Sequence, residues 1–323
     1  MKTKYRILVT PTSFLKPQNA RAKNLLEDFA AEVVYNDLGV PLQGDEILKR
    51  LEGIDGYIAG LDYITSDVIE DMPSSVQVIS RYGVGVERVD LAACAKKGIK
   101  LCNTPGANSV AVCELAFAGM LAVSRNLIRL HEAVERGEWP RNEGCELYGK
   151  TLGIIGLGAI GKNLALRAKA FGMNVTAFDP FMDTIFAKEN DIEVSDLHSV
   201  LTYSDYVSLH LPLNEQTRHM INAETIKDMK KGVIIVNTSR GGIVDENAAA
   251  EALKFGKIGG LVIDAFEQEP LKDSPLKGLP NVLLTPHTGA HTAEAIDKMG
   301  YMAVENLINV LNGKPCKHEL KLS

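Results

Sequence analysis

The stretch Thr151-Leu-Gly-Ile-Ile-Gly-Leu-Gly-Ala-Ile-Gly161 decides how the sequence around it folds. Its apolar residues predict a short buried strand, and the residues after Gly161 have helical character. Gly156, Gly158 and Gly161 stand between the two at the G-x-G-x-x-G spacing. These glycines permit a sharp turn, close approach of a pyrophosphate, and tight packing of the helix on the strand. Because the helix N-terminus also points free N–H groups at an anion, the stretch predicts a dinucleotide-binding site.

A second predicted strand, residues 174–179, indicates which dinucleotide is bound. The strand ends in Asp179, at about the distance from the glycine turn where a ribose-binding carboxylate is expected. A carboxylate there favours the free 2′-hydroxyl of NAD and repels the 2′-phosphate of NADP. We therefore expect NAD as the cofactor. The alternative is that Asp179 is a turn residue at the strand tip, since Pro180 follows it.

Strands alternate with helices along the whole chain, a pattern typical of parallel sheets covered by helices. The length of 323 residues predicts two domains. Residues 108–130 interrupt the alternation and predict one long, largely apolar helix, which suits either a buried core or a subunit interface. The expected strands are 6–10, 31–35, 56–60 and 76–80 before this helix, and 152–156, 174–179, 206–210, 233–237, 260–264 and 281–284 after it.

Composition and charge narrow the classes of partner. The net charge of −6 argues against nucleic acid or an anionic membrane as a partner. We find no signal-peptide pattern and no apolar run near the roughly 20 residues that span a bilayer. The five cysteines form no C-x-x-C pair, so reduced thiols in a cytoplasmic protein are expected, with no metal site.

Three candidate reactive residues each follow a predicted strand. Arg240 follows strand 233–237, Glu269 follows strand 260–264 and its terminal Asp264, and His287 follows strand 281–284. In an open α/β sheet, ligands bind outside the carboxyl ends of the strands, so these loops are expected to converge on the cofactor.

This trio suits the interconversion of a 2-hydroxy acid and a 2-keto acid. Arg240 can bind a carboxylate with its planar fork of donors, and His287 can exchange a proton with the substrate oxygen. An unperturbed histidine, with a pKa of about 6.5, is only about a quarter protonated at pH 7. A neighbouring carboxylate favours the imidazolium, and Glu269 is the expected neighbour. Spacing alone does not distinguish Glu269 from Glu267.

Four motifs in order give the chain a family resemblance: Gly156–Gly161, Asn237-Thr-Ser-Arg-Gly-Gly-Ile-Val-Asp245, Asp264-Ala-Phe-Glu-Gln-Glu-Pro270 and Thr285-Pro-His-Thr-Gly-Ala290. They resemble the D-isomer-specific 2-hydroxyacid dehydrogenases, most of all the short phosphoglycerate dehydrogenases that lack a regulatory domain. The resemblance implies a doubly wound NAD-binding Rossmann domain, residues 102–287, inserted into a flavodoxin-like substrate domain, residues 1–101 and 288–323. It also implies an NAD-dependent enzyme that oxidises 3-phospho-D-glycerate to 3-phosphohydroxypyruvate in serine biosynthesis, and a homodimer.

The resemblance also assigns roles to particular residues. Arg240, Glu269 and His287 match the catalytic set, and Arg81, Val84 and Gly85 match the substrate-binding loop, with Arg240 and His287 also touching the substrate. The positions that match cofactor contacts are Val84, Gly156, Gly158, Ala159, Ile160, Gly161, Asp179, Leu211, Thr238, Ser239, Arg240, Asp264, His287, Gly289 and Ala290.

Two departures from the family pattern leave the substrate open. The arginine that commonly meets the substrate phosphate after the third strand is absent from Ile58-Ala-Gly-Leu-Asp-Tyr-Ile-Thr65, and His291 replaces a small residue. A dehydrogenase for an unphosphorylated acid, such as D-lactate, glyoxylate or hydroxypyruvate, is therefore an alternative. Another is an NAD(H)-sensing protein similar to corepressors of this family.

Overall fold

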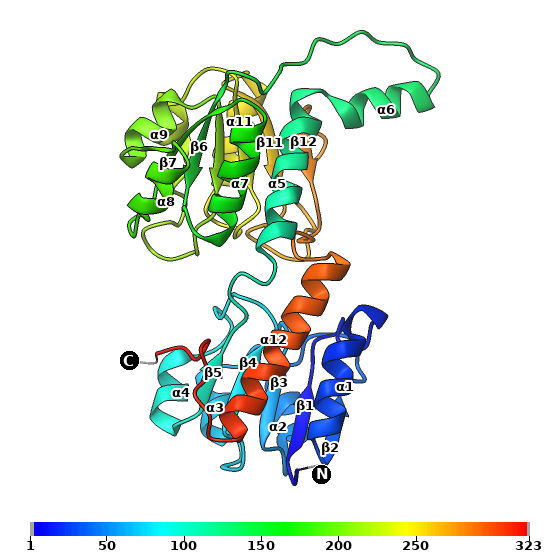
Figure 1. The fold of residues 1–323 in the computed structure, drawn as a ribbon. Coiled ribbons are helices and arrows are strands. Elements are labelled where there is room, and N and C mark those ends of the chain that lie inside the picture. Colours follow the sequence, from blue (N-terminus) through cyan, green and yellow to red (C-terminus); the bar gives the residue numbers. More distant parts are fainter. Residues whose placement is uncertain (1–2, 322–323) are drawn as a thin grey trace. The chain divides into compact units, whose positions relative to one another are not determined.

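The computed structural model describes residues 3–321, which form two compact α/β units (Figure 1). Unit 2 is Ser109–Ala290, and unit 1 combines the chain up to Asn108 with the chain from His291 onward. Each unit is built on one parallel sheet, so the predicted α/β class with two doubly wound sheets is confirmed. The units divide a few residues after the limits expected for the domains, which were residues 101 and 287.

The quoted stretch supplies an interior strand of the sheet of unit 2. In space the strands run β12-β11-β10-β9-β6-β7-β8, and all neighbouring pairs are parallel. The chain leaves β6 towards β7 on one side and returns towards β9 on the other, so the strand order reverses at β6. The strands are β6 (Thr151–Ile155), β7 (Asn174–Phe178), β8 (Glu193–Val194), β9 (Tyr206–Leu209), β10 (Val233–Asn237), β11 (Ile258–Ile263) and β12 (Val282–Leu284).

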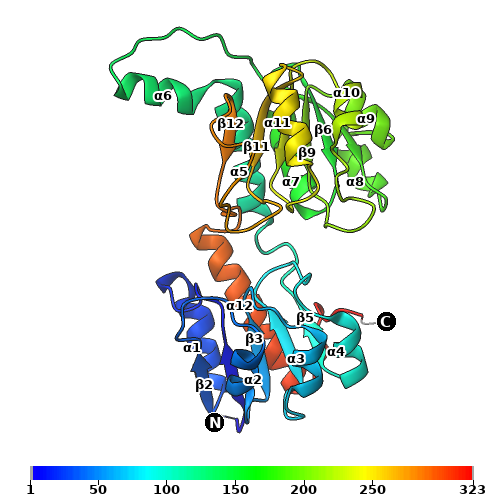
Figure 2. The ribbon, with the colours of Figure 1, turned by 180° about the vertical axis from the view of Figure 1, so that it is seen from behind.

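Helices cover both faces of this sheet, because alternate strand residues point to opposite faces. Ile154 packs in one apolar cluster and Ile155 in the other. The first cluster lies under α5 (Ser109–Ser124) and α7 (Ala159–Ala170). The second lies under the helices that Figure 2 brings forward, α9 (Leu197–Tyr203), α10 (Ala223–Asp228) and α11 (Glu246–Lys254), while α8 (Thr184–Glu189) contacts the edge strand β8.

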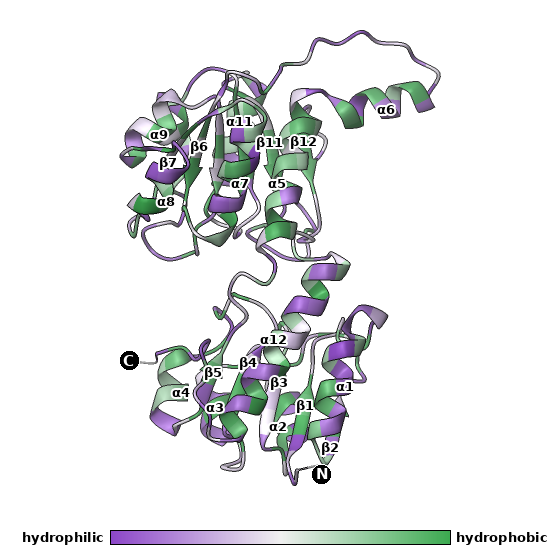
Figure 3. Ribbon diagram, in the orientation of Figure 1, coloured by the Kyte–Doolittle hydropathy of each residue, from purple (hydrophilic) through white to green (hydrophobic). Residues whose placement is uncertain are grey.

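The prediction of a single long helix over residues 108–130 is wrong. The chain forms α5 and then α6 (Leu127–Glu135), bent by 61°. The break occurs because Asn126 adopts the left-handed conformation, with φ of 52°, and its side-chain amide donates to the Glu143 carbonyl. α5 is apolar on most sides (Figure 3) and packs against α7 and three strands. Over residues 3–321 no single helix has the length and apolarity to cross a membrane, although α5 and α6 taken together pass that test.

The sheet of unit 1 has the parallel order β2-β1-β3-β4-β5. Its strands are β1 (Arg6–Val9), β2 (Glu32–Tyr35), β3 (Gly56–Ala59), β4 (Val78–Arg81) and β5 (Lys100–Cys102). One apolar cluster lies between this sheet and α2 (Asp45–Leu51), α3 (Ser66–Asp71) and α4 (Leu91–Lys97). The 3₁₀ turn η1 (Pro17–Asn19), α1 (Ala20–Phe29) and α12 (Ala293–Leu311) pack with one another, α12 also contacting β3, β4 and β5. The C-terminal part of the chain therefore completes the N-terminal unit.

Sequence reasoning did not predict strands β5 and β8. β8 has only two residues, both exposed, and β5 has only three, of which Lys100 is exposed, so both strands are too short to give a clear apolar signal.

The packing of α12 on η1 and α1 generates a prediction. A Cβ placed on Gly300 would overlap Asn19 Oδ1 and approach the Cβ of Ala22. Gly300→Ala should therefore lower the free energy of unfolding by about 1–3 kcal/mol in urea denaturation. Lys298→Ala, at an exposed position of the same helix, should change it by less than about 0.5 kcal/mol. Equal stability of both variants would contradict this packing.

Candidate functional site

The glycine turn forms the strand, turn and helix that its sequence predicts. Gly156 has a φ of 99°, which side chains rarely adopt, and a Cβ on it would strike the His210 carbonyl. A Cβ on Gly161 would overlap the Gly156 carbonyl, while the space beside Gly158 is open. α7 begins at Ala159 with Gly158 as its N-cap. Because first-turn N–H groups have no partner within the helix, those of Ala159 and Ile160 suit an anion.

Asp179 and Leu211 lie against this turn. The Asp179 carboxylate accepts hydrogen bonds from the Leu157 N–H (2.7 Å) and the Phe181 N–H (2.7 Å). Leu211 Cδ2 would lie 3.1 Å from a Cβ on Gly156. The structure thus brings together the residues expected at the pyrophosphate and at the ribose, and Asp179 also holds the turn in shape.

Two observations show that these residues fit a dinucleotide. The open space at Gly158 lets a ligand approach the main chain, as a pyrophosphate requires. Thr238, which follows β10, has a buried Oγ1 without a hydrogen-bond partner in the described structure. A bound ligand would satisfy such an orphaned hydroxyl. The neighbouring Ser239 is instead satisfied internally, since its N–H and Oγ both donate to Asn237 Oδ1.

The structure pairs His287 with Glu269. His287 Nδ1 lies 2.9 and 3.0 Å from the two carboxylate oxygens of Glu269. The Phe266 N–H also donates to Glu269 Oε1 (3.1 Å), which fixes the carboxylate. Glu267, the rival in the sequence, is instead bonded to His219 Nε2 at 2.9 Å.

This pairing changes the chemistry of the imidazole. The hydrogen bond that His287 donates to Glu269 raises the pKa of His287, burial opposes the rise, and the charges of Glu269 and Asp264 add to it. The positive charge of Arg240 acts in the opposite direction. The geometry sets Nδ1 as the N–H that faces Glu269, which leaves Nε2 as the ring nitrogen suited to proton exchange.

Asp264 holds the loop that carries His287. Its buried carboxylate accepts hydrogen bonds from Thr285 Oγ1 (2.6 Å), the Thr288 N–H (2.8 Å) and the Gly289 N–H (2.8 Å). His287 itself has a φ of 51°, an uncommon left-handed conformation for this residue type. Asp264 therefore stabilises a strained turn, and its expected contact with the cofactor, like that of Ala290, stays a prediction.

Arg240 lies on the loop beside the Glu269 loop. A Cβ on Gly241 would overlap the Phe266 carbonyl, so the two loops are in main-chain contact. The Asn237 amide donates to the Arg240 carbonyl (2.8 Å), and Arg240 Nη1 donates to the Ser239 carbonyl (2.8 Å). The three strand ends β10, β11 and β12 therefore bring a cation, a carboxylate and an imidazole to one edge of the sheet.

The other expected substrate residues belong to unit 1. Arg81, at the end of β4, is buried, and its Nη1 donates to the Ala59 and Tyr82 carbonyls. Val84 is exposed in the loop that follows, next to Gly85. Sequence reasoning missed the support of this loop by Asn103, whose amide donates to the Val84 carbonyl (2.8 Å). The sequence signal there is only the short segment Asn103-Thr-Pro105, which does not reveal a long-range contact.

His210 is bonded to Ser208 instead of taking part in the Glu269–His287 pair. Burial lowers the pKa of His210 to about 4, so it is neutral, and its Nε2 lies 2.9 Å from Ser208 Oγ. His291 begins unit 1 ahead of α12. In residues 3–321 no group of three or more histidine, cysteine or acidic side chains is placed to hold a metal ion.

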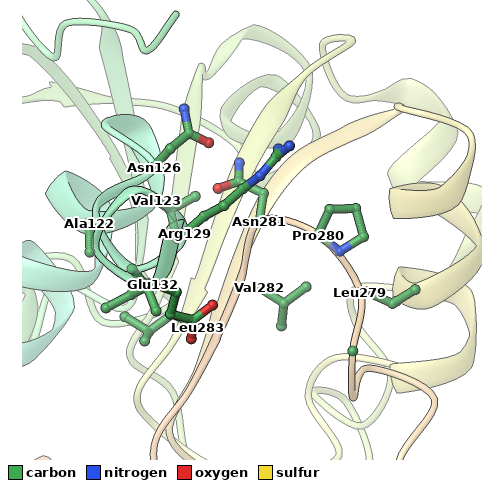
Figure 4. Close-up of a pocket in the computed structure, with 12 residues that line it drawn as sticks. Ala122, Val123, Asn126, Arg129, Glu132, Leu279, Pro280, Asn281, Val282 and Leu283 are labelled. Carbon is green, nitrogen blue, oxygen red and sulfur yellow. The ribbon is translucent and has the colours of Figure 1, made fainter. Parts of the chain in front are cut away.

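A hollow of about 330 Å³ in unit 2 is a different feature (Figure 4). It lies between the α5–α6 bend and the segment that leads into β12, and its lining includes Asn126, Arg129, Asn281 and Val282. Because Val282 begins β12, the hollow is at the amino end of that strand, whereas the Glu269–His287 pair follows the carboxyl ends.

Comparison with known proteins agrees with this geometry. Residues 117–289 match the sequence model of the D-isomer specific 2-hydroxyacid dehydrogenase, NAD binding domain. The chain is 42% identical to D-3-phosphoglycerate dehydrogenase of Methanocaldococcus jannaschii over 96% of its own length, and spans 58% of that protein. It is also 42% identical to hydroxypyruvate reductase of Thermotoga maritima, over 84% of this chain and 89% of that one.

A solved structure shows the same likeness. The apo D-lactate dehydrogenase of Escherichia coli has a TM-score of 0.84 and 32% identity, covering 98% of this chain and all of the other. The expected family, its NAD cofactor and its oxidoreductase class are thereby confirmed. The chain belongs to the D-isomer specific 2-hydroxyacid dehydrogenases and carries their NAD binding domain.

Proposed function

We propose that the chain is an NAD-dependent D-2-hydroxyacid dehydrogenase that oxidises 3-phospho-D-glycerate to 3-phosphohydroxypyruvate. The observation that supports the proposed reaction is the hydrogen-bonded pair of Glu269 and His287. It follows β11 and β12, on loops next to the one that carries Arg240, and all three belong to the unit that holds the glycine turn.

Each of these residues has a distinct task in the proposed reaction. NAD, which the glycine turn and Asp179 would hold, would supply a hydride acceptor for carbon 2 of the substrate. Arg240 binds the substrate carboxylate with its guanidinium, which orients carbon 2. His287 Nε2 removes the hydroxyl proton during oxidation and returns it during reduction. Glu269 stabilises the resulting imidazolium and holds the ring in place.

A phosphorylated substrate requires a positive charge near the end of β3 to bind its phosphate group. Arg88 provides a candidate: its Nη1 donates to the Leu61 carbonyl (2.7 Å), and its guanidinium lies 4.4 Å from the centre of the Tyr63 ring. It is half-buried, and Val84 and Gly85 lie in the same loop. The likeness to the Methanocaldococcus jannaschii phosphoglycerate dehydrogenase also supports this choice.

An unphosphorylated acid is the second candidate substrate. The segment after β3 carries no arginine of its own, and Arg81 donates to main-chain carbonyls. The Thermotoga maritima hydroxypyruvate reductase is as similar as the phosphoglycerate dehydrogenase, and this chain spans more of its length. D-lactate or D-glycerate would then be the preferred hydroxy acid.

Activity measurements separate these candidates. With NAD, the enzyme should form NADH from 3-phospho-D-glycerate with a higher kcat/KM than from D-lactate when the two acids compete. His287→Ala should lower kcat by about 10²–10⁴-fold, because the proton acceptor is lost. Turnover of D-lactate alone would select the second candidate. NADH formation from no D-2-hydroxy acid, or an unchanged rate in His287→Ala, would contradict the proposed reaction and favour a sensing role.

Two arginine variants test the phosphate contact. Arg88→Ala should raise KM for 3-phospho-D-glycerate by about tenfold or more, since a charged hydrogen bond contributes about 1.5–3 kcal/mol, and should leave KM for D-lactate unchanged. Arg81→Ala is the comparison variant, and its KM values for the same two acids are measured alongside. A selective effect of Arg81→Ala alone would transfer the phosphate contact to Arg81.

The pH dependence tests the role of Glu269. Because Glu269 raises the pKa of His287, Glu269→Gln should lower it. Reduction requires the imidazolium, so its kcat/KM falls as pH rises through this pKa, and the fall should begin at a lower pH in the variant. Oxidation requires the neutral ring, so its loss at acid pH should also move to lower pH. Glu267→Gln should shift neither pH dependence. Unshifted pH dependences in Glu269→Gln would contradict the pairing.

We also propose that the protein is a homodimer. α6 projects from the rest of unit 2 and is followed by a long connection (Figure 1). The exposed fractions of Leu127, Ile128, Val134 and Trp139 lie between 50% and 79%. A grouped apolar surface of this kind is typical of a subunit interface.

Measurement of the oligomeric state tests this proposal. Light scattering after gel filtration should give the mass of a dimer, and the double variant Leu127→Asp/Ile128→Asp should give monomers, because charges are costly to bury. Phe255→Asp, at a residue that is 81% exposed at the end of α11, should stay dimeric. A monomeric unmodified chain would contradict the proposal.

A further inference from the structure

Two of the five cysteines meet where the C-terminal tail lies along β5. The tail pairs with this strand through hydrogen bonds from the Leu320 N–H to the Leu101 carbonyl (2.8 Å) and from the Asn103 N–H to the His318 carbonyl (3.3 Å). This pairing places Cys316 Sγ 3.4 Å from Cys102 Sγ. A disulfide has an S–S distance of about 2.05 Å, so the sulfurs need to approach by only about 1.3 Å.

The two thiols differ in their access to solvent. Cys102 is buried, and burial, with the neighbouring Cys316, raises the pKa of its thiol. Cys316 is half-buried and forms part of the wall of an open groove of about 600 Å³. Lys100, Glu319 and Lys321 also line this groove, and Lys100 pairs with Glu319 (3.1 Å). The positive charge of Lys321 exceeds this pair, so a small anionic molecule is attracted to the side on which Cys316 is exposed.

We propose that Cys102 and Cys316 form a reversible thiol–disulfide site that is oxidised by anionic low-molecular-weight disulfides. The Cys316 thiolate attacks one sulfur of the incoming disulfide, forms a mixed disulfide, and releases the first small thiolate. The Cys102 thiol then attacks Cys316 Sγ, and the second small molecule leaves as a thiol with the Cys102 proton. Two protein thiols are thus oxidised to one disulfide, and the external disulfide is reduced to two thiols.

The pair is connected to the loop expected to bind substrate. Cys316 Sγ donates to Asn306 Oδ1 (3.3 Å), and the amide of the buried Asn306 donates to the Asn103 carbonyl (2.8 Å). Asn103 in turn donates to the Val84 carbonyl (2.8 Å). Oxidation removes the Cys316 S–H donor from this chain of hydrogen bonds. The support of Val84 is weakened as a result, so oxidation should reduce the affinity for the hydroxy acid.

Disulfide formation is tested without any substrate. The full-length protein is incubated with oxidised glutathione, its remaining thiols are alkylated, and its peptides are analysed by mass spectrometry. We expect Cys102 and Cys316 in one linked peptide pair that dithiothreitol separates. Cys145→Ser, which removes an exposed thiol, should form the same link, and Cys316→Ser should leave Cys102 free for alkylation after unfolding. Free Cys102 with glutathione retained on Cys316, or two unmodified thiols, would overturn the proposal.

A kinetic measurement tests the connection to Val84 and rests on the proposed function. Oxidation should raise KM for the hydroxy acid by about two- to thirtyfold, and dithiothreitol should reverse the effect. Cys316→Ser, which lacks the attacking thiol and keeps a hydroxyl donor, should be insensitive to oxidised glutathione. A linked pair with an unchanged KM would overturn the connection to the loop, and an absence of turnover in the reduced enzyme would count against the proposed function instead.

Discussion

The carboxylate of Asp264 is the constraint on which the candidate site depends. It lies at the end of β11 and accepts hydrogen bonds from the Thr285 hydroxyl and from the N–H groups of Thr288 and Gly289. These bonds fix the turn in which His287 adopts its left-handed conformation. Without them, the free energy cost of this conformation, on the order of 1–3 kcal/mol, would favour other loop shapes. The position of the imidazole therefore follows from a buried charge that belongs to the neighbouring strand.

The parallel sheet explains how separate segments supply one reaction. Because β10, β11 and β12 run in the same direction, the loops that follow them emerge at one edge and carry Arg240, Glu269 and His287. The charges that change the pKa of His287 lie on these neighbouring loops. The carboxylate of Glu269 favours the protonated ring and the guanidinium of Arg240 disfavours it, so the proton affinity of His287 reflects a balance between residues on three adjacent loops.

Much of this arrangement could be predicted from short-range signals. The glycine spacing, the apolar strands and the residues at their ends are local patterns, and they indicate the fold class and the residues that gather at the strand ends. Features that depend on distant partners could not be predicted. The break at Asn126 involves the Glu143 carbonyl, and the pairing of β5 with the tail joins residues more than two hundred positions apart. The choice between Glu267 and Glu269 required the positions of His219 and His287.

The proposed roles of His287 and Arg240 are tested most directly by a crystal structure of the enzyme with NADH and a non-reacting 2-keto acid analogue. We expect His287 Nε2 to lie within about 2.6–3.2 Å of the keto oxygen. Nδ1 should remain on Glu269, and the Arg240 guanidinium should bind the analogue's carboxylate. An analogue whose keto oxygen contacts neither ring nitrogen of His287, with its carboxylate bound away from Arg240, would contradict these roles.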